Sequence, residues 1–146
     1  MNDFVRRSVE LAMQAGAAGD RPFGSIIVSA QGVVLAEGRN EATSRGDVTA
    51  HAELVALRSA RGTDVPGSTV YASGEPCPMC AAALAWAGVR RIVFAASTAA
   101  FSAVLPGGPR FDIGCAELLE RSDAAIEVQG PVWEVQAVEA MRVAQR

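Results

Sequence analysis

Four side chains in two short stretches of this 146-residue chain have the types and spacing of a metal-dependent hydrolytic site. His51 and Glu53 lie two positions apart, and Cys77 and Cys80 form a Cys-x-x-Cys pair. One imidazole and two thiols suit zinc, and three protein ligands leave one tetrahedral position open for water. Zinc lowers the pKa of such a water to about 7, so hydroxide forms at neutral pH. Glu53, which is not needed as a ligand, is then expected to accept the water's proton and pass it to a substrate nitrogen.

Two other interpretations of these residues remain open. A Cys-x-x-Cys pair is also typical of thioredoxin-like redox proteins, although such a motif does not require His51 and Glu53 upstream. Cys115 is a third cysteine that would close the site as a fourth ligand and make it structural rather than catalytic. A non-catalytic, zinc-stabilised interaction module is therefore an alternative to an enzyme.

Both halves of this set lie where helices are expected to begin. Apolar residues at helical spacing predict one helix from Thr49, as its N-cap, to about Arg61, and a second from Pro78 to Gly88. Proline is favoured at the first helical position. The free N–H groups and the dipole at two helix N-termini would favour thiolates and other negative species around a metal, and would lower the pKa of a cysteine there.

The remaining pattern predicts a sheet covered by helices. The other expected helices and the expected strands are, in chain order, helix 3–18, strands 23–30, 33–37, 69–73 and 91–95, helix 115–121, strand 126–128 and helix 132–143. Asp3 is the expected N-cap of the first helix, and 39–48 and 97–114 are expected loops. This order favours one domain over residues 1–146, an α/β fold with three α/β/α layers and a central mixed sheet of about five strands.

Composition excludes several classes of function. The chain has no lysine, so it can form neither a Schiff-base enzyme nor a Walker-type phosphate loop. The formal net charge of −3 favours a small uncharged substrate over a long nucleic acid, which a basic surface usually binds. No apolar run reaches the ~20 residues that span a bilayer, and the N-terminus has no signal core. We therefore expect a cytoplasmic protein whose cysteines are metal ligands or free thiols.

Motifs over roughly residues 4–95 resemble the cytidine/deoxycytidylate deaminase superfamily. Residues 51–53 (HAE) and 76–80 (PCPMC) match its zinc motif in order and spacing. Residues 22–24 (PFG), 37–40 (EGRN) and 86–93 (WAGVRRIV) extend the likeness. It points to the branch of bacterial guanine deaminases, yeast-type cytosine deaminase and tRNA adenosine deaminases. The resemblance implies a cytidine-deaminase-like fold with one zinc ion per chain.

The resemblance also implies roles for residues around the zinc. Asn40 would hydrogen-bond the substrate base or its sugar, and the Ala52 N–H would hold a base carbonyl. Phe23 and Trp86 would wall the pocket. In the C-terminal third, where the resemblance is weak, Glu134 is a further candidate for a substrate contact.

Within the branch, residues 22–24 and 76–80 are most similar to guanine deaminases. We predict hydrolytic deamination of an amino-substituted nucleobase or related heterocycle, guanine first, with release of ammonia. The alternatives are a tRNA adenosine deaminase, against which the acidic balance argues, and a cytosine or cytidine deaminase with the same site. The resemblance implies a homodimer. From the charge and the lack of a long apolar run, we expect a small-molecule heterocyclic amine as the partner, and neither a nucleic acid nor a membrane. Gly74 departs from the pattern, since a larger residue usually precedes Glu75, and is expected to widen the pocket.

Overall fold

A mixed five-stranded sheet forms the centre of the computed structural model, which describes residues 2–61 and 64–145. The strands are β1 (Gly24–Val28), β2 (Val34–Arg39), β3 (Thr69–Gly74), β4 (Arg91–Ala96) and β5 (Glu127–Gln129). Their order across the sheet is β2-β1-β3-β4-β5. β1 is antiparallel to both neighbours, whereas β3, β4 and β5 are parallel. The predicted α/β fold with a mixed sheet is confirmed.

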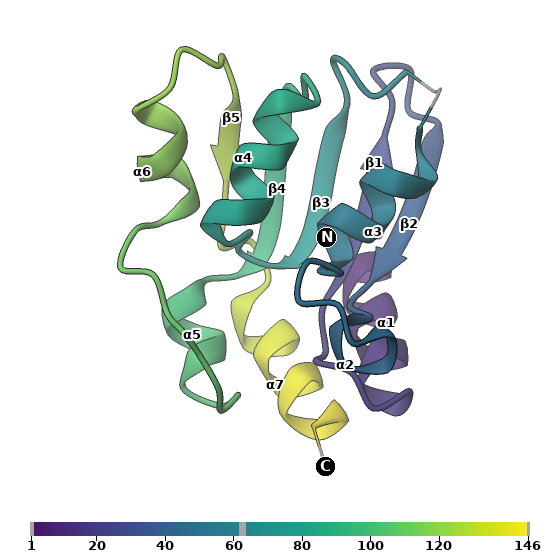
Figure 1. The fold of residues 1–146 in the computed structure, drawn as a ribbon, viewed down its shortest axis with the longest axis vertical. Coiled ribbons are helices and arrows are strands. Elements are labelled where there is room, and N and C mark those ends of the chain that lie inside the picture. The colour runs from purple at the N-terminus through teal and green to yellow at the C-terminus, as the bar shows by residue number, and fades with distance from the viewer. Residues whose placement is uncertain (1, 62–63, 146) are drawn as a thin grey trace.

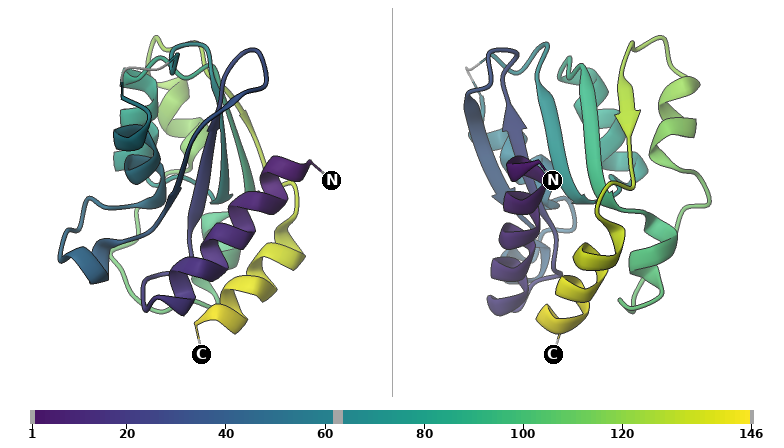
Figure 2. Two further views of the ribbon diagram at one scale, coloured as in Figure 1. Left: turned by 90° about the vertical axis from the view of Figure 1, so that its right-hand side faces the viewer. Right: turned by 180° about the vertical axis from the view of Figure 1, so that it is seen from behind.

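Helices cover both faces of the sheet and complete three layers (Figures 1 and 2). The long helices are α1 (Asp3–Ala17), α3 (Ala52–Ser59), α4 (Pro78–Trp86), α6 (Cys115–Glu120) and α7 (Glu134–Ala144). α1 and α7 lie side by side on one face, and α3, α4 and α6 lie on the other (Figure 2). Ile26 and Val28 of β1 join the core beneath α1 and α7, while Ile27 joins the opposite core. This alternation is the two-residue period of a strand that is buried on both faces.

Two helices begin at other residues than the sequence predicts. Asn2, not Asp3, is the N-cap of α1, and its side chain accepts hydrogen bonds from the first turn. The N-cap of α3 is His51, not Thr49. Thr49 instead lies in the preceding turn, where its N–H and hydroxyl both donate to Asp47. The Asn2 side chain accepts N–H groups at the start of a helix, whereas the Asp47 side chain accepts the Thr49 N–H in a turn before a helix. Short polar side chains can do either, and the sequence pattern does not show which one occurs.

Two short helices lie inside segments predicted as loops. α2 (Ala42–Arg45) follows β2, and α5 (Thr98–Ser102) follows β4. Neither has a buried residue, so apolar periodicity could not indicate them. The Pro/Gly-rich stretch 106–112 is irregular and exposed, as predicted. In the described part of the chain, no helix has the length and apolar character needed to cross a membrane.

Candidate active site

The N-termini of α3 and α4 bring the three predicted metal ligands together. His51 is the N-cap of α3, Cys77 is the N-cap of α4, and Cys80 lies in the first turn of α4. The sulfurs of Cys77 and Cys80 each lie 3.5 Å from His51 Nδ1. The ligand atoms of all three residues lie within 4.8 Å of one another. Residues 26 and 29 positions apart in the sequence therefore form one compact donor set.

The spacing of these donor atoms fits zinc. Tetrahedral zinc with bonds of about 2.3 Å to sulfur and about 2.05 Å to nitrogen holds those two atoms about 3.5 Å apart. Both sulfur–nitrogen distances have this value. A His/Cys/Cys set is also the donor chemistry that zinc prefers. His51, Cys77 and Cys80 would hold the ion through Nδ1 and the two sulfurs.

Cys115 does not complete a four-ligand site. Among the residues that the structure describes, the metal-ligating group is limited to His51, Cys77 and Cys80. Cys115 is buried at the start of α6, and burial raises the pKa of its thiol to about 12. A closed structural zinc site would need a fourth protein ligand, which Cys115 does not provide, whereas a catalytic zinc site needs only three.

Glu53 is a buried carboxyl group beside the ligand set. It lies in the first turn of α3, two residues after His51, and is 6% exposed. Burial raises its pKa to about 7, and a hydrogen bond with Cys80 opposes this rise. A bound cation would also lower this pKa. A carboxyl group that titrates near neutral pH can both accept and donate a proton, as a proton shuttle must.

The two thiols have different ionisation tendencies. Hydrogen bonds from Cys80 and from His51 lower the pKa of Cys77 to about 4, although burial opposes them. The hydrogen bond to Cys77, together with burial, raises the pKa of Cys80 well above its usual range. The pKa of His51 is raised, chiefly by its hydrogen bond to Cys77. The lowered pKa of Cys77 favours its thiolate, which is the form of cysteine that binds a metal ion.

Hydrogen bonds fix the orientation of Asn40 at the end of β2. It directly follows β2 and is 4% exposed. Its Oδ1 accepts the Ala42 N–H at 3.0 Å, and its own N–H donates to the Phe23 carbonyl at 3.0 Å. With Oδ1 engaged, the amide NH₂ group remains as the hydrogen-bond donor for a ligand. Ala52 is the first residue of α3, so its N–H also has no acceptor within the helix.

Two aromatic rings occupy the space beside Gly74. Phe23 and Phe101 pack edge to face with centroids 5.0 Å apart. A Cβ atom on Gly74 would lie 2.8 Å from Phe23 Cε1 and 3.0 Å from Phe101 Cε2. The expectation that Gly74 widens the pocket is therefore wrong, because the two rings fill the vacated volume. Phe101 lies in α5, inside a segment that the sequence pattern predicts as a loop.

Replacing Gly74 by alanine is expected to destabilise the protein by about 1–3 kcal/mol, since the added methyl group must displace both rings. Gly108→Ala is the matched control: its Cβ would meet no atom closer than 3.7 Å, and its cost should stay within about 0.5 kcal/mol. Urea unfolding of the two variants measures the difference. Equal stability of the two variants would contradict the packing described here.

Trp86 was expected to wall the substrate pocket and Glu134 to contact the substrate, but the structure gives both residues other surroundings. Trp86 is the last residue of α4, at the opposite end from Cys77, and is 91% exposed. The length of the helix thus keeps Trp86 from walling the pocket within one chain. Glu134 begins α7, and its Oε2 accepts the Ser97 N–H at 2.8 Å. Its observed role is to join α7 to the segment that follows β4.

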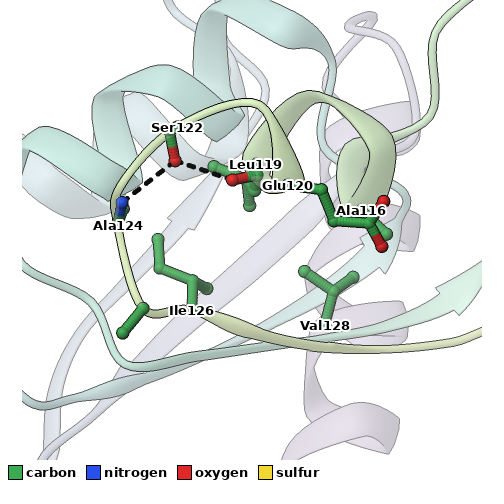
Figure 3. A pocket seen from close by; sticks show the side chains of 8 residues that line it. Ala116, Leu119, Glu120, Ser122, Ala124, Ile126 and Val128 are labelled. Atoms are coloured by element: carbon green, nitrogen blue, oxygen red, sulfur yellow. Dashed lines mark hydrogen bonds between the residues drawn. The ribbon is translucent and has the colours of Figure 1, made fainter.

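A separate groove lies between α6 and β5 (Figure 3). Its lining includes the side chains of Leu119, Ile126 and Val128. None of the metal ligands or other candidate site residues lines it. The groove also contains no cluster of groups suited to acid–base or metal chemistry, so it is not a second candidate active site.

Comparison with known proteins agrees with this site. The family described as "Cytidine and deoxycytidylate deaminase zinc-binding region" matches residues 1–96. A probable cytosine deaminase of Schizosaccharomyces pombe is 34% identical over 140 residues, which cover 92% of this chain and 86% of that protein. A tRNA-specific adenosine deaminase of Haemophilus influenzae is 38% identical over 97 residues, which cover 64% of this chain and 56% of that protein. These two relatives are thus named for different substrates, cytosine and the adenosine of tRNA.

A solved structure extends the likeness to nearly the whole chain. The guanine deaminase from Nitrosomonas europaea superposes with a TM-score of 0.81 at 26% identity, over 97% of this chain and 82% of that one. The shared fold therefore includes the C-terminal third, beyond the matched residues 1–96. On the family match and on the grouping of His51, Cys77 and Cys80, this chain belongs to the cytidine/deoxycytidylate deaminase superfamily of zinc-dependent deaminases.

Proposed function

We propose that this deaminase hydrolyses a free amino-substituted nucleobase, with guanine as the favoured substrate, and releases ammonia. The observation that carries the proposal is the buried Glu53 carboxyl group beside a three-donor set with the spacing of an open zinc site. The likeness of residues 22–24 and 76–80 to guanine deaminases, and the formal net charge of −3, support a small uncharged base over tRNA.

The protein groups around the site have separate roles in this reaction. When bound, zinc would supply a water activated for attack on the ring carbon that bears the amino group. Glu53 accepts a proton from this water and delivers it to the adjacent ring nitrogen. Glu53 then carries the second proton to the amino group, the carbon–nitrogen bond breaks, and ammonia leaves. Asn40 and the Ala52 N–H orient the base through hydrogen bonds.

The proposal is tested by measuring ammonia release from the zinc-loaded protein. The panel contains guanine, cytosine, adenine, their nucleosides, pterin and triazine amines, with tRNA in a separate assay. We expect the highest kcat/KM for guanine. A higher kcat/KM for cytosine or cytidine would instead assign a pyrimidine as the substrate. Adenosine deamination in tRNA that weakens as salt is added would support a tRNA deaminase instead.

Asn40 provides a prediction about substrate binding. Asn40→Asp keeps an oxygen to accept the Ala42 N–H but loses the amide donor, so KM should rise by about 5- to 100-fold. Asn40→Ala loses both interactions and should in addition unfold at lower urea concentration. Steady-state kinetics and urea unfolding separate the two effects. An unchanged KM in Asn40→Asp would exclude a substrate contact through the amide.

We also propose that the chain forms a homodimer through the outer face of α4. Met79, Ala82 and Trp86 lie on this face at helical spacing and are exposed. A tryptophan that is 91% exposed is unusual unless a partner covers it. Trp86→Arg should therefore convert dimers to monomers in analytical ultracentrifugation. Val135→Arg, at an exposed position on α7, is the control and should leave the dimer intact.

A further inference from the structure

Glu75 makes hydrogen bonds to three different segments next to the metal ligands. It lies between β3 and α4, two residues before Cys77. Its Oε1 accepts the Thr98 N–H at 2.9 Å, and its Oε2 accepts the Cys115 N–H at 2.8 Å. Its own N–H donates to the Ala96 carbonyl at 2.8 Å. Both carboxylate oxygens thus bind backbone groups that lie 23 and 40 residues away in the sequence.

The two segments bound by this carboxylate lead to Phe101 and to the exposed stretch 106–112. Thr98 is the first residue of α5, which carries Phe101 onto the ring of Phe23. Cys115 is the first residue of α6, directly after the exposed stretch 106–112. The carboxylate therefore joins the connection that carries Cys77 to the start of the helix that holds Phe101 against Phe23, and to the end of the neighbouring loop.

The segment from α5 to the exposed loop has few fully buried side chains, although Phe101 and Val104 pack against the core. α5 contains no buried residue, and 106–112 is exposed along its whole length. Leu105, which is buried, and the bond from the Ser97 N–H to Glu134 are further attachments in this region. A segment with few buried contacts opens locally at low cost in free energy. Its position then depends on hydrogen bonds, and those to an ionised carboxylate are the stronger ones.

We propose that Glu75 is a positioning residue. Its carboxylate fixes the start of α5 at Thr98 and the start of α6 at Cys115 relative to the β3–α4 connection that carries Cys77, and it thereby sets substrate affinity. This inference rests on the proposed deaminase function. Glu75 does not belong to the metal-ligating group, so zinc binding should not depend on it. Loss of its carboxylate should release Phe101 and the neighbouring loop while His51, Cys77 and Cys80 stay in place.

The test compares Glu75→Ala, Glu75→Gln and a matched control, Asp20→Asn. Like the half-buried Glu75, the buried Asp20 accepts two hydrogen bonds through its carboxylate, from the Ser44 N–H and hydroxyl at 2.8 Å each, but it fixes α2. Zinc content, hydrogen exchange of the Thr98 and Cys115 amides, KM and kcat are measured for each protein. In Glu75→Gln the amide oxygen can still accept one backbone N–H, but the NH₂ group is a donor and cannot accept the other. The exchange rates and KM of this variant should therefore lie between those of wild type and Glu75→Ala.

For Glu75→Ala we expect one zinc per chain, faster exchange at both amides, and a loss of about 10- to 100-fold in kcat/KM that lies mainly in KM. Asp20→Asn should change neither exchange rate. Unchanged exchange or an unchanged KM in Glu75→Ala would overturn the proposal, as would loss of zinc or the same changes in Asp20→Asn. If the wild-type protein releases no ammonia from any amine, the proposed function fails, while the exchange rates still decide whether Glu75 holds both segments.

Discussion

Replacing Glu53 by glutamine is expected to lower kcat for ammonia release by about 10²- to 10⁴-fold while one zinc ion per chain remains bound. This loss corresponds to about 3–5 kcal/mol of activation free energy. Glutamine has nearly the size of glutamate but cannot accept the proton of the attacking water. Because Glu53 is 6% exposed and solvent is largely excluded around it, bulk water is a poor substitute for its proton transfer.

The measurement combines single-turnover ammonia release with metal analysis of the same sample. Glu117→Gln is the matched control, since Glu117 is also a glutamate in the first turn of a helix but is exposed and pairs with Arg121. It should retain wild-type kcat, and its stability should change by less than about 0.5 kcal/mol. Wild-type kcat in Glu53→Gln would exclude Glu53 as the proton shuttle.

Replacing Cys80 by alanine is expected to abolish both zinc binding and activity. Cys80 and Cys115 are both buried, at 0% and 2% exposure, but only Cys80 belongs to the metal-ligating group. Cys115→Ala should therefore retain one zinc per chain and activity, and lose only a small amount of packing free energy. This pair separates loss of a ligand from loss of a buried sulfur.

Stability in the presence of zinc gives the second measurement for this pair. A ligand that binds only the folded state stabilises it by about 4 kcal/mol when present at about 1,000 times its Kd. Wild-type protein and Cys115→Ala should show this zinc-dependent gain and lose it when a chelator is added. Cys80→Ala should show little gain at any zinc concentration. Full zinc-dependent stabilisation of Cys80→Ala would contradict its assignment as a ligand.

The ligand set was accessible from sequence because its signals are local. A histidine and a cysteine each at a helix start, with Glu53 and Cys80 close by, are recognisable from spacing alone. The structure brings His51, Cys77 and Cys80 into one group with sulfur–nitrogen distances of 3.5 Å. Sequence could not supply these distances, because they depend on how α3 and α4 pack on the sheet.

Predictions for the pocket walls were less successful, because walls are built by side chains distant in sequence. The space beside Gly74 was expected to be open, but Phe23 and Phe101 fill it. Trp86 was expected in the wall, but the length of α4 places it away from Cys77. Glu134 lies at the start of α7, where it binds the Ser97 N–H. None of these outcomes can be derived from neighbouring residues.

The sequence by itself determined a His/Cys/Cys set that could hold zinc, the deaminase family to which the chain belongs, and an α/β fold with a mixed sheet. These follow from side-chain chemistry and from periodicity within each element. Only the tertiary structure decided the burial that raises the pKa of Glu53 to about 7 and the bonds from Glu75 to Thr98 and Cys115. Burial and long-range hydrogen bonds arise when distant segments pack together, so spacing along the chain does not encode them.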